Sequence, residues 1–234
     1  MTIHRRAVFL LAAILAVPIL PVRAAEPPYV TATQLDLVPF LPPPDASGSD
    51  ADRAAQQAVV AAQRATSPDR VALAAADAEE SVFAMFASVL GPAFATEALP
   101  DATRFFDRVG ETEDAVVDPA KKHFNRTRPF MANEAEIKPL VKPSRSGAYP
   151  SGHATRVTMA AIILSSMLPE KRAAIWARAE EYAQSRVIGG MHYPQDLEGG
   201  KRAGSAIAAM MFTDPDFIGD YALARSEIRR ALAL

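Results

Sequence analysis

The chain has 234 residues, half of them hydrophobic and 22% charged, which is enough for one sizeable globular core. It carries 25 Lys and Arg against 27 Asp and Glu, and this balance gives no support to nucleic-acid or anionic-membrane binding as its main function. It has no cysteine, which excludes disulfides, zinc–thiolate sites and cysteine nucleophiles.

Residues 1–24 have the three-part pattern of a secretory signal peptide. A basic start with Arg5 and Arg6 precedes an apolar run over residues 7–20, and permissive residues lead up to Ala24. The run is shorter than the ~20 residues of a membrane-spanning helix, which disfavours an uncleaved anchor. Cleavage after Ala24 removes three arginines and no acidic residue, so 22 Lys and Arg remain against 27 Asp and Glu, a formal charge of −5. We expect a periplasmic or secreted protein that does not insert into a membrane after cleavage.

Residues 25–50 are predicted to form a proline-rich arm. Four of its prolines fall within residues 35–49, where they fix φ and withhold backbone donors, so we expect no helix there. Beyond the arm, apolar stripes predict helices over residues 52–65 and 69–90, the second ended by Gly91-Pro92.

The middle of the chain predicts two separate helices and a loop. Asp101, as an N-cap after a proline, predicts a helix over residues 101–109. Asp118-Pro119 has the pattern of an N-cap followed by proline at the first helical position, which predicts a new helix carrying Lys121. Residues 139–150 are rich in Pro, Ser and Gly and are predicted to be a loop.

Four further helices are predicted in the second half, over residues 151–168, 170–187, 194–211 and 216–232. Ser151 is expected to cap the first of them, and Gly189-Gly190 to close the second, with Trp176 on its buried face. Pro194 is expected to begin the third. No alternating strand pattern is present, so we predict a single all-α domain over residues 51–234.

Three short stretches combine cations, imidazoles, a carboxylate and a Ser-Gly turn, which together could bind a tetrahedral oxyanion. They are Lys121-x6-Arg128-Pro129, Pro150-Ser151-Gly152-His153 and Ser185-Arg186-x5-His192-x3-Asp196. Arg128 and Arg186 each offer a planar fork of donors matched to two phosphate oxygens, whereas Lys121 supplies a compact charge. Taken singly, each of these cations is more often a solvated surface residue.

The second stretch is compatible with an anion site. Gly152 would let the backbone approach a ligand, and the N–H groups of a helix beginning after Ser151 would point at an anion. A capped helix start with a partly exposed His153 is an equally good interpretation of the tetrapeptide alone.

The third stretch places a histidine and a carboxylate together. Asp196 in the first turn of a helix begun by Pro194 could accept a hydrogen bond from one ring nitrogen of His192. That bond would fix the tautomer and leave the other nitrogen free to attack. Alone, the pair is better explained as a contact that stabilises a turn.

In this order and spacing the three stretches resemble the signature of the type 2 phosphatidic-acid phosphatase (PAP2) superfamily, which includes bacterial class A acid phosphatases and vanadium haloperoxidases. Every specified position is met, with 20 residues between Pro129 and Pro150 and 31 between His153 and Ser185. The exported, soluble class A non-specific acid phosphatases are the most similar, since they share the chain length and a proline-rich start. The resemblance implies a helical bundle of the PAP2/vanadium haloperoxidase type. Many class A enzymes carry cysteines, and their absence here leaves the substrate preference open.

The resemblance also implies a role for each matching residue. His192 would be the nucleophile that forms a phosphohistidine, oriented by Asp196, and His153 would be the general acid and then the base. The phosphoryl oxygens would be held by Lys121, Arg128, Ser151, Gly152 and Arg186. These three cations would take the place of metal ions, so no metal and no cofactor are expected. His123 matches no specified position and is expected to lie at the surface or behind the site.

The leading hypothesis is an exported acid phosphatase that acts on small-molecule phosphate monoesters of broad range, with phosphotransferase activity as a subsidiary expectation. The alternatives are a vanadium-dependent haloperoxidase, disfavoured by the chain length, an exported phosphatase of lipid or polyprenyl diphosphates or of lipopolysaccharide, and a non-catalytic helical module. Exposed apolar helix faces would be compatible with a homo-oligomer.

Overall fold

The computed structural model describes residues 26–234, so the predicted signal peptide lies outside the described residues. Within them the chain forms ten α-helices, two short 3-10 helices and no strand, which confirms the all-α prediction. The α-helices are α1 (Leu37–Phe40), α2 (Asp50–Arg64), α3 (Pro68–Ala76), α4 (Val82–Leu90), α5 (Pro100–Phe124), α6 (Pro129–Ala132), α7 (Gly152–Met167), α8 (Arg172–Ile188), α9 (Pro194–Met211) and α10 (Pro215–Ala231). The 3-10 helices are Thr96–Ala98 and Pro169–Lys171.

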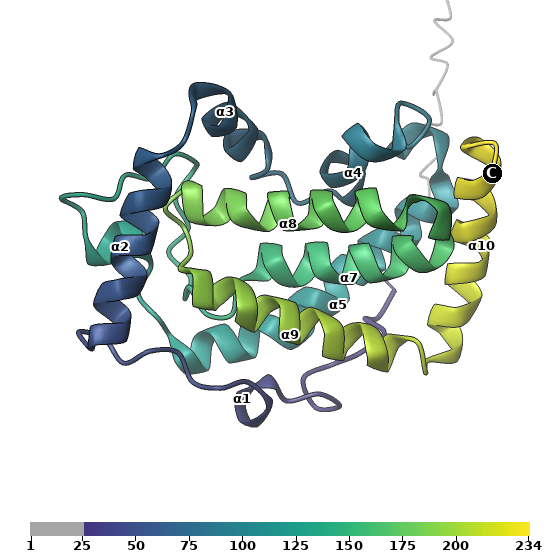
Figure 1. Cartoon of the computed structure of the whole chain (residues 1–234). Coiled ribbons are helices and arrows are strands. Elements are labelled where there is room, and N and C mark those ends of the chain that lie inside the picture. The colour runs from purple at the N-terminus through teal and green to yellow at the C-terminus, as the bar shows by residue number, and fades with distance from the viewer. Residues whose placement is uncertain (1–25) are drawn as a thin grey trace, which may run out of the picture.

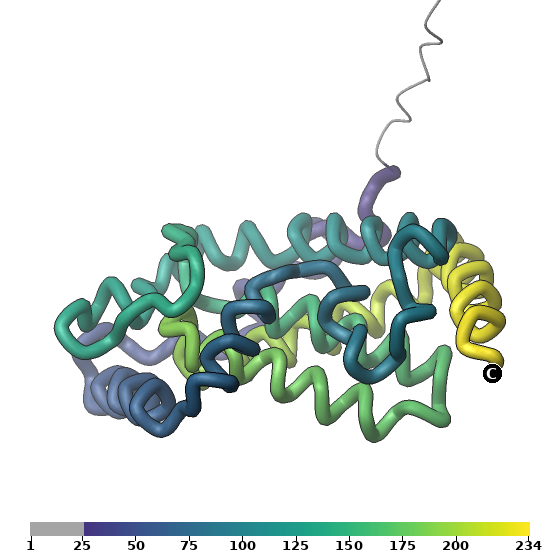
Figure 2. The backbone as a smooth tube through the Cα atoms, turned by 90° about the horizontal axis from the view of Figure 1, so that it is seen from above, coloured from purple at the N-terminus to yellow at the C-terminus, as the bar shows by residue number. Residues whose placement is uncertain are grey.

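Helix α7 is the centre of the fold. Twelve of its sixteen residues are buried, so it is apolar around most of its circumference, as expected of a helix surrounded by others. It packs most extensively against α9 and α8, and Figure 1 shows these three helices side by side with α5 behind them. Helices α2 and α10 close opposite ends of the bundle, an arrangement that is also visible from above in Figure 2.

Helix starts in the second half follow the predictions closely. Ser151 is the N-cap of α7, and its hydroxyl accepts from the Ala154 amide at 3.3 Å. Pro194 occupies the first position of α9, which runs to Met211 as predicted. These boundaries depend on local chemistry, which a sequence pattern can report.

The single helix predicted over residues 69–90 is wrong, because the chain leaves the helix between α3 and α4. Tertiary polar contacts outweigh helix continuation here. The Asp77 carboxylate accepts from Arg178 and from the Ser185 hydroxyl, and the Glu79 carbonyl accepts from the Tyr182 hydroxyl at 2.8 Å. We call residues 77–81 the inter-helix loop.

The break predicted between residues 109 and 118 is also wrong, since α5 is one helix with Pro119 inside it. A proline there lacks the N–H that would bond to the preceding turn. The buried residues Val116, Val117 and Ala120 hold this stretch against the core. Packing therefore keeps Lys121 in the last turn of a long helix, rather than near the start of a short one.

Two smaller predictions fail for local reasons. The arm does contain a helical turn, α1, because Asp36 caps it and Pro39 lies in its first turn, where no helical N–H partner is needed. Trp176 is 41% exposed, because the buried stripe of α8 contains Ile175, Ala179 and Tyr182 and faces away from it.

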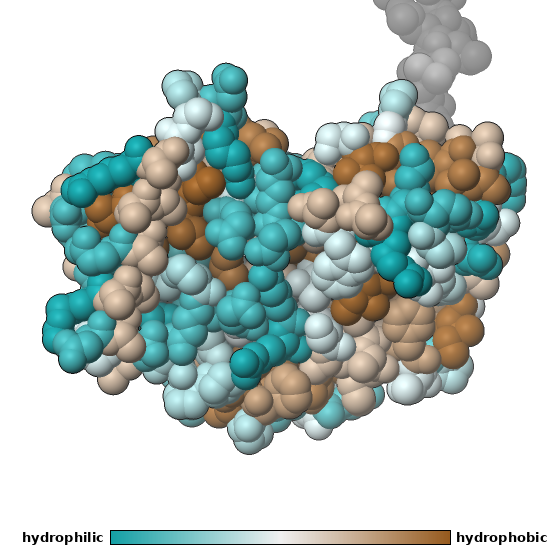
Figure 3. All heavy atoms as spheres, viewed as in Figure 1, coloured by the Kyte–Doolittle hydropathy of each residue, from teal (hydrophilic) through white to brown (hydrophobic). Residues whose placement is uncertain are grey.

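The surface is mixed. Figure 3 shows a largely hydrophilic centre on one face, with apolar patches toward the end where α10 lies. Exposed apolar side chains include Ile218 and Leu223 of α10, and a homo-oligomer stays a prediction. No helix within residues 26–234 has the length and apolarity needed to cross a bilayer.

Candidate active site

The predicted site residues lie at the ends of helices that meet in one region. Lys121 is in the last turn of α5 and Arg186 in the last turn of α8. Ser151 caps α7, and Gly152 and His153 are its first two residues. Arg128 is the N-cap residue of α6, His192 precedes α9 and Asp196 lies in the first turn of α9.

Close packing between α7 and α9 brings two of the stretches together. A Cβ atom at Gly200 would lie 2.6 Å from the Ser151 carbonyl oxygen, so only glycine fits at this approach. The Ser151 amide donates to the Asp196 carbonyl at 3.0 Å. The start of α7 and the start of α9 are thereby fixed to each other.

His192 is buried, with its two ring nitrogens in different surroundings. Nδ1 lies 2.8 Å from the Ala148 carbonyl oxygen, which can only accept, so Nδ1 carries the proton. Nε2 lies 3.1 Å from Arg128 Nη1, a donor, and therefore presents its lone pair. Burial, together with Arg128 and Arg186, lowers the pKa of His192 well below its usual value. The ring is a neutral imidazole suited to nucleophilic attack.

Asp196 does not make the direct hydrogen bond to His192 that the sequence predicted. Its Oδ2 lies 3.6 Å from His192 Nδ1, farther than the Ala148 carbonyl oxygen at 2.8 Å. Instead, Asp196 accepts from the Tyr193 amide and from Arg126 Nη1, each at 2.8 Å. Burial raises the pKa of Asp196, whereas the charge of Arg126 and the hydrogen bonds from Arg126 and the Tyr193 amide favour its carboxylate form, which accepts from both donors. Asp196 acts on His192 as a nearby carboxylate and by fixing the start of α9.

Arg126 is a residue that the sequence analysis missed. It lies within the unspecified positions of Lys121-x6-Arg128, so no pattern marked it. Its side chain is buried over the Tyr193 ring, with its guanidinium carbon 4.2 Å from the ring centre. Besides Asp196 it faces Asp45 and Asp52, at 3.7 and 3.8 Å. Arg126 thus connects the start of α9 to the N-terminal arm and to α2.

The two predicted arginines are buried and differ in how they are held. Arg128 is 4% exposed and donates to Ser146 through Nε at 2.9 Å and Nη2 at 3.1 Å; burial lowers its pKa to about 10. Arg186 is also 4% exposed, yet its Nε and Nη1 have no hydrogen-bond partner within residues 26–234. Lys121 Nζ lies beside Gly152, 2.8 Å from the position of an added Cβ. Within the described residues, Arg186 is thus a buried cation with unused donors, which the oxygens of an oxyanion would complete.

His153 sits at the positive end of α7 and is held by the inter-helix loop. Its Nδ1 lies 2.7 Å from Glu80 Oε1, and its Nε2 3.3 Å from the Ala78 carbonyl oxygen. Tyr182 stacks on the ring, with centroids 6.0 Å apart. Burial lowers the pKa of His153, and the hydrogen bond to Glu80 opposes that effect.

Comparison with known proteins assigns the chain to a family. A family model described as the PAP2 superfamily matches residues 112–219, which include all eight predicted site residues. The chain is 31% identical over 198 residues to the acid phosphatase of Zymomonas mobilis, covering 82% of this chain and 75% of that protein. It is 30% identical over 196 residues to the non-specific acid phosphatase of Salmonella typhi, covering 81% of this chain and 78% of that protein. The chain belongs to the PAP2 superfamily.

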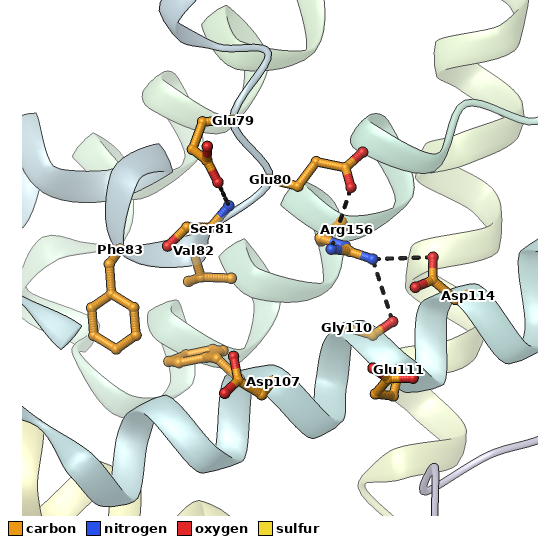
Figure 4. Close-up of a pocket in the computed structure, with 11 residues that line it drawn as sticks. Glu79, Glu80, Ser81, Val82, Phe83, Asp107, Gly110, Glu111, Asp114 and Arg156 are labelled. Atoms are coloured by element: carbon orange, nitrogen blue, oxygen red, sulfur yellow. Dashed lines mark hydrogen bonds and ion pairs between the residues drawn. The ribbon is translucent and has the colours of Figure 1, made fainter. Parts of the chain in front are cut away.

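In this PAP2 superfamily member a pocket of about 430 Å³ lies next to the His153 partner Glu80. Figure 4 shows Glu80 and Asp114 on either side of Arg156, with Glu79, Asp107 and Glu111 also lining the pocket. Arg156 lies 3.5 Å from Glu80, 2.9 Å from Glu113 and 3.2 Å from Asp114. These residues were not predicted from the sequence, because the apolar pattern of residues 69–90 predicted a helix that includes Glu80.

His123 lies outside this arrangement, as expected. It is exposed in the last turn of α5, and its described contact is an edge-to-face packing against the Phe124 ring, with centroids 5.1 Å apart.

Proposed function

We propose that this protein is an exported, metal-independent acid phosphatase that hydrolyses phosphate monoesters of broad range through a phosphohistidine at His192. The relatives named as acid phosphatases support hydrolysis of phosphate monoesters. The observation that carries the mechanism is a buried neutral imidazole, whose unprotonated Nε2 lies 3.1 Å from a buried guanidinium.

Binding uses the cations at the helix ends. Arg128, Arg186 and Lys121 hold the phosphoryl oxygens, and the N–H groups at the start of α7 add the positive end of a helix dipole. These fixed positive charges neutralise the transferring phosphoryl group, so the proposal requires no metal ion.

In the first step the His192 Nε2 lone pair attacks phosphorus, a P–N bond forms and the bond to the leaving oxygen breaks. The resulting imidazolium keeps its proton on Nδ1, which donates to the Ala148 carbonyl. Its positive charge is stabilised by the nearby Asp196 carboxylate. His153, in its protonated form, gives its proton to the leaving oxygen.

In the second step the now neutral His153 takes a proton from water. The water oxygen attacks phosphorus, the P–N bond breaks, and inorganic phosphate leaves with His192 restored. An alcohol in place of water would give phosphotransferase activity through the same step.

The proposal places the mature enzyme in the periplasm or outside the cell. Its support is the pattern of residues 1–24, a basic start followed by an apolar run and Ala24. N-terminal sequencing of the protein recovered from the cell envelope should give Ala25 as the first residue.

Hydrolysis of an aryl phosphate with and without excess chelator tests the proposed chemistry. We expect the same turnover in both conditions and no turnover by His192→Ala. Loss of turnover on chelation would contradict the metal-independent mechanism, and full activity of His192→Ala would contradict the nucleophile.

A further inference from the structure

The Glu80 carboxylate is placed on the general acid by a segment remote from the three stretches. Its Oε1 lies 2.7 Å from His153 Nδ1, and the side chain stays 45% exposed at the edge of the pocket. On the other side of the ring, the Ala78 carbonyl oxygen lies 3.3 Å from Nε2. Both contacts come from the inter-helix loop.

This loop is fixed in place by α8. Asp77 is bound by Arg178 and by Ser185, the first residue of the third stretch. The Tyr182 hydroxyl donates to the Glu79 carbonyl at 2.8 Å, and the Tyr182 ring stacks on His153. The positions of Glu80 and Ala78 are therefore set by the same helix that carries Arg186.

Two acceptors on one imidazole favour its protonated form, because only imidazolium can donate from both nitrogens. Burial and one nearby charge act on the ring in the opposite direction. Burial and the Arg186 charge lower the pKa of His153, whereas Glu80 and the Ala78 carbonyl raise it. Glu80 itself stays ionised, since His153 lowers its pKa to about 2, with help from Arg156 and Lys121.

Arg156 keeps Glu80 from turning toward solvent. It lies 3.5 Å from Glu80 Oε2 and is itself held by Glu113 and Asp114, as Figure 4 shows in part. The two oxygens of Glu80 are thus divided between His153 and Arg156.

We propose that Glu80 is a positioning residue: its contact with Nδ1 keeps His153 oriented and protonated, and Nε2, whose contact with the Ala78 carbonyl is the longer one, gives its proton to the leaving oxygen. Arg156 holds Glu80 in place. The inference rests on the proposed phosphatase function. Glu80 lies outside the three stretches, and its half-exposed carboxylate contributes little to packing.

The test compares leaving groups that differ in their need for a proton. We would measure kcat/KM, which reports only steps up to leaving-group departure, for an alkyl phosphate and for 2,4-dinitrophenyl phosphate. In Glu80→Gln, kcat/KM for the alkyl ester should fall by about 10-fold or more, because general acid catalysis contributes about 10²- to 10⁴-fold. The value for the dinitrophenyl ester should stay within about 3-fold, since its leaving group departs without a proton. The basic limb of the alkyl-ester pH profile should move to lower pH.

Glu79→Gln is the matched control, because Glu79 lines the same pocket and its carboxylate accepts from the Ser81 amide. It removes the same charge without contact to His153 and should leave the ratio between the two esters unchanged. Glu80→Asp should restore part of the alkyl-ester rate. Equal losses for both esters, or no loss, in a Glu80→Gln protein with an unchanged thermal transition would overturn the inference. Failure of the wild type to hydrolyse either ester would instead overturn the proposed function.

Discussion

Arg186 is a residue whose surroundings are incomplete without a ligand. It is 4% exposed, and its Nε and Nη1 are unpaired within residues 26–234. A buried donor without a partner costs about 1–3 kcal/mol of stability. We infer that the site keeps this cost because phosphoryl oxygens complete the hydrogen bonds.

Arg186→Met should therefore change stability and activity in opposite directions. Removing the unpaired charge should raise the free energy of unfolding by about 1–3 kcal/mol, while kcat/KM for an aryl phosphate should fall about 10²-fold or more. Inorganic phosphate should raise the thermal transition of the wild type by more than that of the variant, which keeps Arg128 and Lys121. Denaturant titration and steady-state kinetics measure stability and activity. A less stable variant would contradict the cost of the unpaired donors, and a variant that phosphate stabilises as much as the wild type would show that these donors do not bind the anion.

The two histidines predict an acidic pH optimum. His192 must be neutral to attack, and its pKa lies well below its usual value of about 6.5, so the acidic limb of kcat/KM moves to low pH. His153 must be protonated, and burial lowers its pKa as well, so the basic limb also moves down. A pH profile of kcat/KM should be a bell displaced to the acidic side of neutrality. A maximum at alkaline pH would contradict these roles.

At the scale of the elements, the site depends on how closely α9 approaches α7. A Cβ at Gly204 would lie 2.6 Å from the Thr155 carbonyl oxygen, which is backbone and cannot turn away. Gly204→Ala should destabilise the protein by about 1–3 kcal/mol through overpacking. Gly219 on α10 has no atom within 4 Å of such a Cβ, so Gly219→Ala should stabilise by about 0.5–1 kcal/mol. Urea unfolding of both variants measures the difference; a Gly204→Ala protein as stable as the wild type would mean that the contact between α7 and α9 is looser than described.

The inter-helix loop shows why one element escaped prediction. Residues 69–90 have a continuous apolar stripe that is compatible with one helix, and no glycine or proline marks the break. The break is caused by α8, about a hundred residues later in the chain, through Arg178 and Tyr182. A sequence window contains no information about such partners.

At the scale of the whole molecule, the N-terminal arm joins the site to distant parts of the bundle. The arm packs along the bundle, with Tyr29 bonded to Asp220 of α10 at 2.7 Å. Further along, the Pro42 carbonyl accepts from Tyr149 at 2.7 Å and the Asp45 amide donates to Gln195 at 2.9 Å. The predicted arm over residues 25–50 is thus in direct contact with the segment just before Ser151 and with the segment just after His192.

Site residues whose partners are adjacent in the chain could be predicted from the sequence better than those whose partners are remote. The cap at Ser151 and the helix start at Pro194 depend on adjacent residues, and both are confirmed. The acceptor of the His192 proton was predicted wrongly, because the Ala148 carbonyl reaches it from 44 residues away. Arg126 and Glu80 were missed for the same reason, since their partners lie 70 or more residues distant.

The central claim is that His192 carries the phosphoryl group during turnover. His153→Ala should still be phosphorylated by 2,4-dinitrophenyl phosphate, whose leaving group needs no proton, but it lacks the base for the second step. The adduct should accumulate, and peptide mass spectrometry after an alkaline quench, which preserves phosphohistidine, should place one phosphoryl group on His192. A phosphoryl group on another residue, or dinitrophenol release without any adduct on His192, would contradict the account.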